Sequence, residues 1–433
     1  MLASRPLLAF ALAFLAAPAL GQGPVTVTVI AVPPLTTPDT KNSGTDSPLA
    51  VAYQASDLIA SDLRSTAELV AIPPSQKDYY SYPEVTAPSF SKWRARGAKL
   101  LLTGFVRARP DGRLTFGCYA YDVQTGRELG RKGFAVDPDD WRRAAHKCSG
   151  VAYTAATGAP GIFDTRVAYV AETGVATARV RRVAVMDSDG TAQSYVTAGD
   201  TIVLTPRLSP KAESLAYVSY LGGQPRVRVV DLDSGEQRPL VAVEAMTFAP
   251  RYSPDGNRIL FAMQLGPNTD VYVVNAGGGP PQRLTNAPGI DTDASFSPDS
   301  SRIVFESDRS GSQQLYLMGA DGSGQHRISF GGGWYAAPAW SPDGEWIAFV
   351  RRVPGFGLRI GVMKPDGSGE RLLTAGPSDE SPSWAASGQE LLFQRTGPDG
   401  RSSLYRISLL GGEPRQMTTP QDASDPDWSG TLD

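Results

Sequence analysis

Histidine and cysteine are scarce in this chain of 433 residues, which contains only two of each. Neither His146 nor His326 stands near a serine or cysteine in a context typical of a nucleophile, and no G-x-S-x-G motif occurs. A hydrolase built on a catalytic triad is therefore not expected. Two cysteines also cannot supply the four ligands of a structural zinc site. We predict a protein without catalytic residues, metal or cofactor.

An excess of charge of one sign is also absent, because 41 basic residues nearly balance 44 acidic ones and leave a net charge of -3. Proteins that bind nucleic acids are usually strongly basic, so we do not expect a nucleic-acid partner.

Long hydrophobic runs are lacking as well. The run from Leu7 to Ala17 is too short to span a membrane. It follows Arg5 and precedes the small-residue site Ala19-Leu20-Gly21, which predicts a cleaved signal peptide over residues 1–21. No later segment is long and apolar enough to insert into a membrane. We therefore expect an exported, soluble, periplasmic protein, and we expect it to be a monomer.

Bulky side chains recur at a spacing of 44 residues in the second half of the chain. A proline stands two residues after four of them, in the sequence Ser-Pro at each place. A constant period of this length indicates a repeat architecture. The six bulky positions are Leu208, Tyr252, Phe296, Trp340, Trp384 and Trp428.

Each repeat is predicted to contain four short strands. In the repeat around Tyr252 these are residues 250–253, 258–263, 270–274 and 282–285, and Pro254-Asp255-Gly256 between the first two is typical of a type I turn. Four short strands repeated every forty-odd residues are the signature of propeller blades.

The two ends of the repeat region predict how the propeller closes. Six second strands are present, but the first, at residues 166–170, has no inner strand before it, whereas residues 425–429 form an inner strand with no blade after it. We therefore predict a six-bladed β-propeller over residues 159–433, closed by the C-terminal strand. The alternative, an open stack of sheets, leaves both of these strands unpaired.

Residues 22–158 have a different periodicity and predict a small α/β or α+β domain. Strands are expected at 25–32, 69–72, 99–107, 113–122 and 127–136, and helices at 49–63, 90–97 and 139–157. His146 falls on the last helix, where we expect a structural role near the domain junction. The order of the strands in the sheet does not follow from the sequence.

The two cysteines, Cys118 and Cys148, both belong to this domain. In an oxidising compartment such a pair commonly forms a disulfide; two buried thiols are the alternative. The aspartate-rich segment Asp187-Ser188-Asp189-Gly190 does not continue into a calcium-binding loop, so we interpret it as a turn between strands.

Several motifs together resemble the TolB family, the periplasmic propeller proteins of the Tol-Pal cell-envelope system. The resemblance extends over essentially the whole mature chain. It is carried by the stretch Phe163–Val170, the repeated Ser-Pro-Asp-Gly after an aromatic residue, Ser307-Asp308-Arg309, Ser381-Pro382-Ser383-Trp384, and, before the propeller, Ala60–Arg64 and Trp141–His146.

This resemblance implies a non-enzymatic docking protein that supports outer-membrane integrity and constriction during cell division. The partners that it implies are Pal, the peptidoglycan-associated lipoprotein, on the propeller, and TolA on the mature N-terminus. Loops that lead from one blade to the next should lie together around one channel mouth, and aromatic residues there are candidate anchors. The candidate Pal-binding residues in these loops are Phe248, Asp291, Thr292, Asp293, Trp334, Tyr335, Asp379, Glu380 and Asp422.

The candidate TolA-binding segment is short, since only Gln22 to Thr28 separate the predicted cleavage site from the first strand. Gln22, Val25 and Val27 are its candidate contact residues. The alternating valines are compatible with addition as a strand to a partner's sheet edge, and equally with the first strand of the small domain.

Two other functions stay open beside the scaffold. A propeller enzyme would act in the central channel, and turnover of peptides or glycans would reveal it. A small-ligand sensor would use the same channel, and its ligand would raise the thermal stability of the folded protein.

Overall fold

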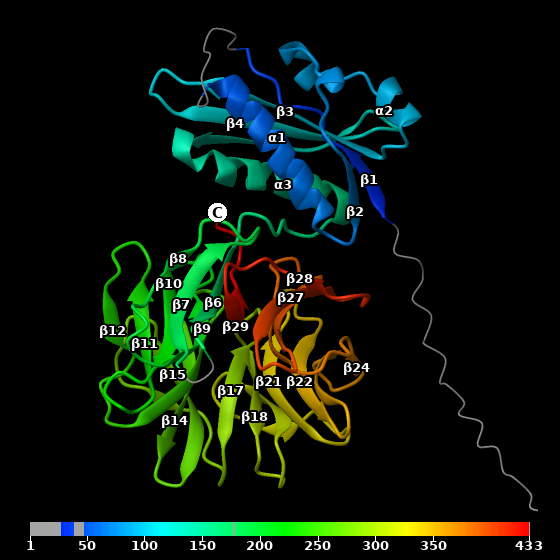
Figure 1. Ribbon diagram of the computed structural model, residues 1–433. Coiled ribbons are helices and arrows are strands. Elements are labelled where there is room, and N and C mark those ends of the chain that lie inside the picture. The colour runs from blue at the N-terminus through cyan, green and yellow to red at the C-terminus, as the bar shows by residue number, and fades with distance from the viewer. Residues whose placement is uncertain (1–26, 39–46, 176–177, 433) are drawn as a thin grey trace, which may run out of the picture.

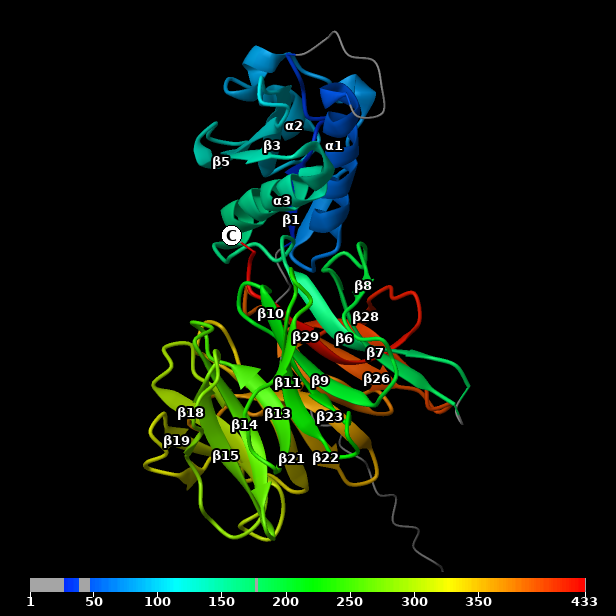
Figure 2. The same ribbon diagram turned by 90° about the vertical axis from the view of Figure 1, so that its left-hand side faces the viewer.

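The computed structural model describes residues 27–38, 47–175 and 178–432. These residues form two parts, an N-terminal domain and a β-propeller. Figures 1 and 2 show the N-terminal domain at one end of the propeller.

The N-terminal domain is built on one five-stranded sheet with the strand order β2-β1-β3-β4-β5. Strand β1 (Thr28–Ala31) runs parallel to its neighbours β2 (Leu69–Ile72) and β3 (Leu100–Ala108), and β4 (Leu114–Asp122) and β5 (Glu128–Val136) continue the sheet antiparallel. The sheet is therefore mixed, in agreement with the predicted fold class. Strand β1 is shorter than the predicted 25–32.

Two long helices, α1 (Pro48–Arg64) and α3 (Trp141–Thr157), pack against each other and against this sheet. Ser47 caps the start of α1 by accepting a hydrogen bond from the Ala50 amide, and α3 ends at Gly158, whose φ of 77° is left-handed. The shorter elements are α2 (Ser91–Ala95) and single turns at Gln76–Asp78, Tyr82–Val85 and Pro138–Asp140. Among the described helices, none is both long and apolar enough to cross a bilayer.

A disulfide fastens α3 to the sheet. It joins Cys118 of β4 to Cys148 of α3, whose Cα atoms lie 5.6 Å apart. This is the pairing that the sequence suggested. Both cysteines are fully buried within the largest core cluster of the molecule.

The propeller consists of six four-stranded sheets, which we call blades 1 to 6. Their inner strands are β29 (Asp422–Trp428), β9 (Val203–Leu208), β13 (Met246–Tyr252), β17 (Asp291–Phe296), β21 (Trp334–Trp340) and β25 (Asp379–Trp384). Their second strands are β6 (Arg166–Thr173), β10 (Ser214–Ser219), β14 (Arg258–Leu265), β18 (Arg302–Ser307), β22 (Ile347–Val353) and β26 (Glu390–Thr396). Their third strands are β7 (Val180–Asp187), β11 (Arg226–Asp231), β15 (Asn268–Asn275), β19 (Gln314–Gly319), β23 (Gly357–Met363) and β27 (Ser402–Ser408). Their outer strands are β8 (Ser194–Tyr195), β12 (Gln237–Pro239), β16 (Gln282–Arg283), β20 (His326–Arg327), β24 (Arg371–Leu372) and β28 (Arg415–Gln416).

The C-terminal strand closes the ring, as predicted. Blade 1 has the order β29-β6-β7-β8, and Trp428 of β29 is paired with Val167 of β6. The indole nitrogen of Trp428 also donates a hydrogen bond of 2.8 Å to Thr165 Oγ1. Residues more than 250 positions apart in the chain thus share one blade.

Each inner strand contains a bulge at the same place. The register of its pairing with the second strand shifts there, and one non-glycine residue adopts a φ between 45° and 54°. Because the strand continues past the bulge, the inner strands are longer than predicted; β13 begins at Met246, not at residue 250. The six bulged residues are Thr205, Ala249, Asp293, Ala337, Ser381 and Asp425.

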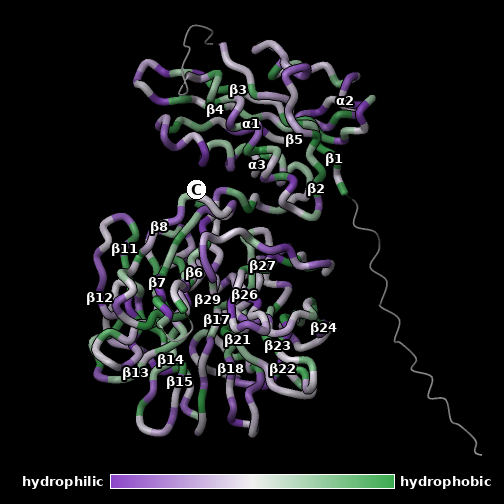
Figure 3. Tube along the Cα trace, viewed as in Figure 1, coloured by the Kyte–Doolittle hydropathy of each residue, from purple (hydrophilic) through white to green (hydrophobic). Residues whose placement is uncertain are grey.

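The blades pack through the repeated bulky residues. All six, from Leu208 to Trp428, are less than a tenth exposed. Figure 3 shows hydrophobic residues along strands such as β14 and β15 and hydrophilic ones along the outer strand β12. Burial between the blades is therefore the physical reason for the 44-residue period.

The alternating strand directions give the propeller two distinct ends. The inner strands turn into the second strands at one end, which we call the domain end because Asp189 and Leu432 contact the N-terminal domain there. The opposite end, which we call the open end, carries the turns between second and third strands and the loops from one blade to the next. Figure 1 shows the β14–β15 and β18–β19 turns there, far from the N-terminal domain.

A buried histidine lies at the junction of the two parts. His146 Nδ1 of α3 is 2.8 Å from Asp62 Oδ2 of α1, and its Nε2 is 3.6 Å from Asp189 Oδ2 in the β7–β8 turn. Burial disfavours protonation, but the hydrogen bond to Asp62 and the surrounding carboxylates raise the pKa of His146 above its ordinary value. Arg142 also contacts Asp189, at 2.5 Å. The predicted junction role of His146 agrees with this geometry.

Candidate partner-binding face of the propeller

The nine candidate Pal-binding residues all lie at or near the open end, but not in loops as predicted. Each belongs to the first half of an inner strand, on β13, β17, β21, β25 or β29. The loop placement was wrong because the bulges extend these strands toward the open end. Proximity to the channel mouth was the correct part of the expectation.

Three of the nine side chains are fully buried: Asp291, Tyr335 and Asp379. Asp379 accepts two hydrogen bonds from Arg395 of β26, at 2.6 and 3.0 Å, and Asp291 accepts one from Arg309 at 2.8 Å. These ion pairs hold the first residue of an inner strand against the same blade. The buried carboxylates present no surface to a partner.

Tyr335 is part of a similar internal contact. Its hydroxyl donates to Glu370, at 2.9 Å, and Arg351 contacts the same carboxylate at 2.6 Å. Burial, followed by the hydrogen bond to Glu370 and the negative charge of that carboxylate, raises the pKa of Tyr335. Tyr335 therefore stabilises blade 5 from within.

The other six candidates are partly exposed. Three of them, Phe248, Thr292 and Asp293, line one hollow of about 440 Å³ together with Ile290. The wall of this hollow is mostly apolar, because Leu204, Val218 and other residues of two neighbouring blades complete it. An apolar hollow beside one carboxylate is suited to a side chain of a protein partner.

Trp334, Glu380 and Asp422 stand on other blades of the same end. Trp334 packs against the core shared by blades 5 and 6. Glu380 accepts a hydrogen bond of 3.0 Å from Ser378, and both carboxylate oxygens of Asp422 lie 3.0 Å from Arg401 Nε. These residues are spread along the rim and do not form one cluster.

Carboxyl groups line the channel just inside the open end. Burial, and then the charge of Asp293, raise the pKa of Glu306 to about 8, and burial also raises the pKa of Asp293. Asp425 accepts hydrogen bonds from the Thr205 amide and the Ser381 hydroxyl. This part of the channel is therefore acidic, with part of its charge suppressed by burial.

The most exposed apolar residues of the propeller are not among the candidates predicted from the sequence. Their shared signal is a large apolar residue in a turn between second and third strands or just before an inner strand, where a polar residue is usual. Seven lie at the open end: Val175, Ile202, Leu221, Leu265, Ile290, Phe330 and Phe356. In the described part of the propeller, three others lie on outer strands or at the domain end: Tyr195, Leu372 and Leu410.

One group of possible metal ligands occurs among the described residues, at the junction of the two parts. The ligand atoms of His146, Asp187 and Asp189 lie within 4.8 Å of one another. The guanidinium of Arg142 already stands beside Asp189, so the group is suited to an ion-pair network rather than to a cation. The other histidine, His326, is exposed on outer strand β20, and its Nδ1 lies 2.8 Å from the Gly324 carbonyl oxygen.

The predicted N-terminal segments lie mostly outside the described residues. This holds for the signal peptide and for Gln22 and Val25. Val27 is 39% exposed and precedes β1. Within the described sheet, β1 lies between β2 and β3.

The fold defines a class of protein: a six-bladed propeller with an N-terminal α/β domain at one end and exposed apolar side chains at the other. Comparisons with known proteins agree. The sequence model of the TolB β-propeller domain matches residues 153–432, and that of the TolB amino-terminal domain matches residues 22–129. The chain belongs to the TolB family.

Individual relatives support this assignment. The Tol-Pal system protein TolB of Rhizorhabdus wittichii is 48% identical over 216 residues, which are 48% of this chain and 49% of the relative. That of Zymomonas mobilis is 48% identical over 46% of this chain and 43% of the relative. The matched part thus spans about half the length of these relatives.

A solved structure matches over more of the chain. The crystal structure of TolB from Acinetobacter baumannii aligns with a TM-score of 0.78 and 27% identity, and it covers 93% of this chain and 97% of that one. Both the propeller and the N-terminal domain therefore have a counterpart in a known TolB structure.

Proposed function

We propose that this protein is a non-enzymatic periplasmic scaffold of the Tol-Pal system. It docks Pal on the open end of the propeller and TolA through its mature N-terminus, and it supports outer-membrane integrity and constriction during cell division. Membership of the TolB family supports the assignment to the Tol-Pal system. The distribution of exposed side chains supports the location of the docking face at the open end.

The observation that carries the docking proposal is the set of seven exposed apolar side chains at the open end. Exposed apolar residues gathered on one face of a soluble protein are typical of a protein interaction site. Phe356 is 67% exposed and Phe330 is 73% exposed, although burial of an aromatic side chain lowers the free energy of the protein in water. A protein partner on this face would remove them from water.

The hollow beside Phe248 supplies a specific anchor point within that face. Its apolar wall suits a large side chain of Pal, and Asp293 at its edge suits a hydrogen-bond donor next to that side chain. Trp334 and Glu380 extend the contact along the rim. Buried Asp291, Tyr335 and Asp379 act indirectly, because they fix the strands that carry these residues.

TolA is proposed to engage the segment from Gln22 to Val27. Val25 and Val27 alternate with polar residues in this segment, a pattern that suits addition as a strand to a sheet edge of TolA. Deletion of residues 22–27 should abolish TolA binding and leave the affinity for Pal unchanged. Equal loss of both affinities would contradict a separate tail site.

Calorimetric titration with the soluble domain of Pal from the same organism tests the docking face. Leu265→Asp introduces a charge at the open end, and Leu410→Asp introduces the same charge at the domain end on a leucine of similar exposure, 52% against 46%. We expect one-to-one binding that Leu265→Asp weakens at least about tenfold, or 1.4 kcal/mol, and that Leu410→Asp leaves unchanged. Equal effects of the two variants on the affinity for Pal would contradict a docking site at the open end.

A further inference from the structure

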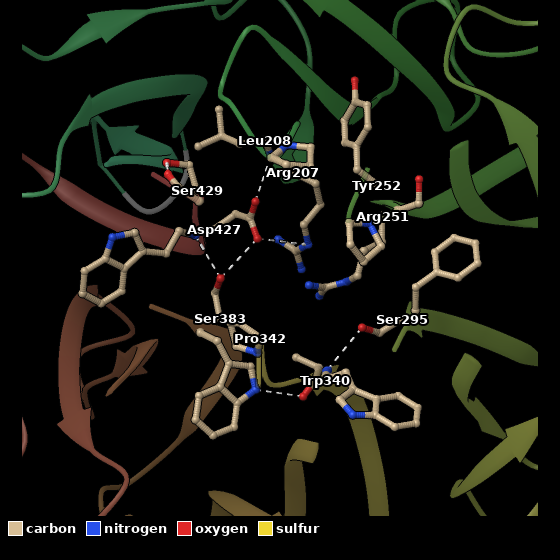
Figure 4. Close-up of a pocket in the computed structure, with 18 of the residues that line it drawn as sticks. Arg207, Leu208, Arg251, Tyr252, Ser295, Trp340, Pro342, Ser383, Asp427 and Ser429 are labelled. Atoms are coloured by element: carbon tan, nitrogen blue, oxygen red, sulfur yellow. Dashed lines mark hydrogen bonds and ion pairs between the residues drawn. The ribbon is translucent and has the colours of Figure 1, made fainter. Parts of the chain in front are cut away.

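A ring of six equivalent residues lines the channel near the domain end. Each stands one position before the buried bulky residue of its inner strand, so the spacing is again 44 residues. All six line a cavity of about 380 Å³ (Figure 4). The ring consists of Arg207, Arg251, Ser295, Ala339, Ser383 and Asp427.

Two arginines on neighbouring blades give this ring its chemical character. Figure 4 shows the guanidinium groups of Arg207 and Arg251 directed into the cavity from adjacent strands. Arg207 donates a hydrogen bond of 2.9 Å to the Pro206 carbonyl. Arg251 has neither a hydrogen-bond nor an ion-pair partner for its side chain among the described residues. A guanidinium carries five donors, so most of the donors of this pair face the cavity.

The carboxylates nearby do not neutralise Arg251. Asp427 Oδ2 accepts the Leu208 amide at 2.8 Å, Oδ1 accepts the Ser383 hydroxyl at 3.2 Å, and the distance from Oδ1 to Arg207 Nε is 4.0 Å. Asp293, deeper in the channel, forms no ion pair with either arginine within the described structure. Burial raises the pKa of Asp293, and the charges of Arg207 and Arg251 act against that shift.

The two guanidinium groups also repel each other. Burial, and then the charge of Arg207, lower the pKa of Arg251 to about 10. Arg251 nevertheless keeps its proton at neutral pH. The charged residues that line the cavity are thus two arginines and one carboxylate, and the rest of the lining consists of serines, prolines and other uncharged residues, among them Phe296, Trp340 and Trp384.

We propose that this cavity binds a small oxyanion, a carboxylate or a phosphate group, between Arg207 and Arg251. Guanidinium groups pair with the planar oxygens of carboxylates and phosphates through two parallel hydrogen bonds. Such a ligand would supply hydrogen-bond acceptors to Arg251 and would offset the repulsion between the two arginines. The site lies at the domain end, opposite the proposed Pal-docking face, and is therefore independent of that function.

Thermal unfolding and calorimetry of the mature protein test the site with two probes, inorganic phosphate and succinate. Sodium chloride at matched ionic strength controls for screening. The test variant is Arg251→Gln, which removes the charge, and the matched control is Arg352→Gln, at an exposed arginine of β22 outside the channel. Arg207→Gln is a second test variant, which serves if Arg251→Gln does not fold.

We expect phosphate or succinate to raise the melting temperature of the wild type saturably, as a ligand of the folded state does. Arg251→Gln should weaken this binding at least tenfold, and Arg352→Gln should leave it unchanged. Without ligand, Arg251→Gln should be at least as stable as the wild type, because the repulsion is removed. The probe that binds more tightly identifies the oxyanion.

Three results would overturn the proposal. The first is a stabilisation that chloride reproduces at the same ionic strength. The second is binding of phosphate and succinate that the arginine variants do not weaken, and the third is no binding of either probe to the wild type.

Discussion

The two ends of the propeller are built from the same repeat but differ in how much apolar surface they expose. At the domain end, the bulky residues from Leu208 to Trp428 are buried between blades, and the turns contact the N-terminal domain. At the open end, the same strands begin with partly exposed residues, and apolar side chains such as Phe330 and Phe356 remain in water. The 44-residue period alone does not distinguish these ends; the residues on each side of the bulge do.

This difference separates stability from binding along each strand. Residues after the bulge are fixed by packing, so substitutions there should lower the free energy of unfolding. Exposed residues at the open end make few internal contacts, so substitutions there should change binding and leave stability nearly constant.

The largest effect is expected for Trp428→Ala, which removes a buried ring that joins the last strand to the first blade. It should lower the free energy of unfolding by about 3–5 kcal/mol, because a large cavity replaces the indole and Thr165 loses its hydrogen-bond partner. Phe356→Ala, at the open end, should change it by less than about 0.5 kcal/mol. Urea unfolding of both variants measures the contrast, and equal losses would remove the distinction between the ends.

An intermediate effect is expected for Asp379→Asn, which breaks an internal ion pair of the open end. Arg395 would lose the charge that it contacts at 2.6 and 3.0 Å, at a cost of about 3 kcal/mol. Glu380→Gln, one residue further along the same strand, is partly exposed and should be nearly neutral. If the two variants unfold at the same urea concentration, Asp379 has no structural role.

A smaller effect is expected from titration of His146 at the domain end. The groups that face it are Asp62, Asp187, Asp189 and Arg142. Its pKa is raised in the folded state, so its stabilisation is complete below the unfolded pKa of about 6.5 and is lost as the pH rises through the folded value. The free energy of unfolding should therefore fall as the pH rises above the unfolded pKa of about 6.5.

Chemical denaturation at several pH values checks this slope in the wild type and in His146→Gln. Glu306, with a pKa of about 8, also makes the free energy of unfolding fall as the pH rises. The two proteins, with and without His146→Gln, should therefore be compared in a Glu306→Gln background. Retention of the full slope after His146→Gln in that background would contradict the role assigned to the histidine.

The sequence predicted the architecture well because its determinants are local and repeated. The spacing of Tyr252 and its equivalents gave the number of blades, and the unpaired strand at 425–429 gave the closure that β29 and β6 make. Hydrophobic periodicity similarly placed α1 and α3. Each of these features depends on patterns that recur at fixed intervals along the chain.

The candidate site was less predictable because burial at a strand start depends on distant partners. Nothing near Asp379 in the sequence indicates that Arg395 will pair with it, so the sequence could not distinguish this buried carboxylate from the partly exposed Glu380. The bulge was hidden too, since its left-handed residue is Thr, Ala, Asp or Ser rather than glycine. Arg207 and Arg251 are 44 residues apart in the sequence, but the sequence does not indicate that their side chains point into the channel.

Hydrogen–deuterium exchange of the protein with and without the soluble domain of Pal tests the central claim most directly. The account predicts slower exchange in open-end segments, such as residues 286–292 and 330–336, and no change in the domain-end turns around Asp255 and Asp343. Protection of the domain-end turns with unchanged exchange at the open end would contradict the account.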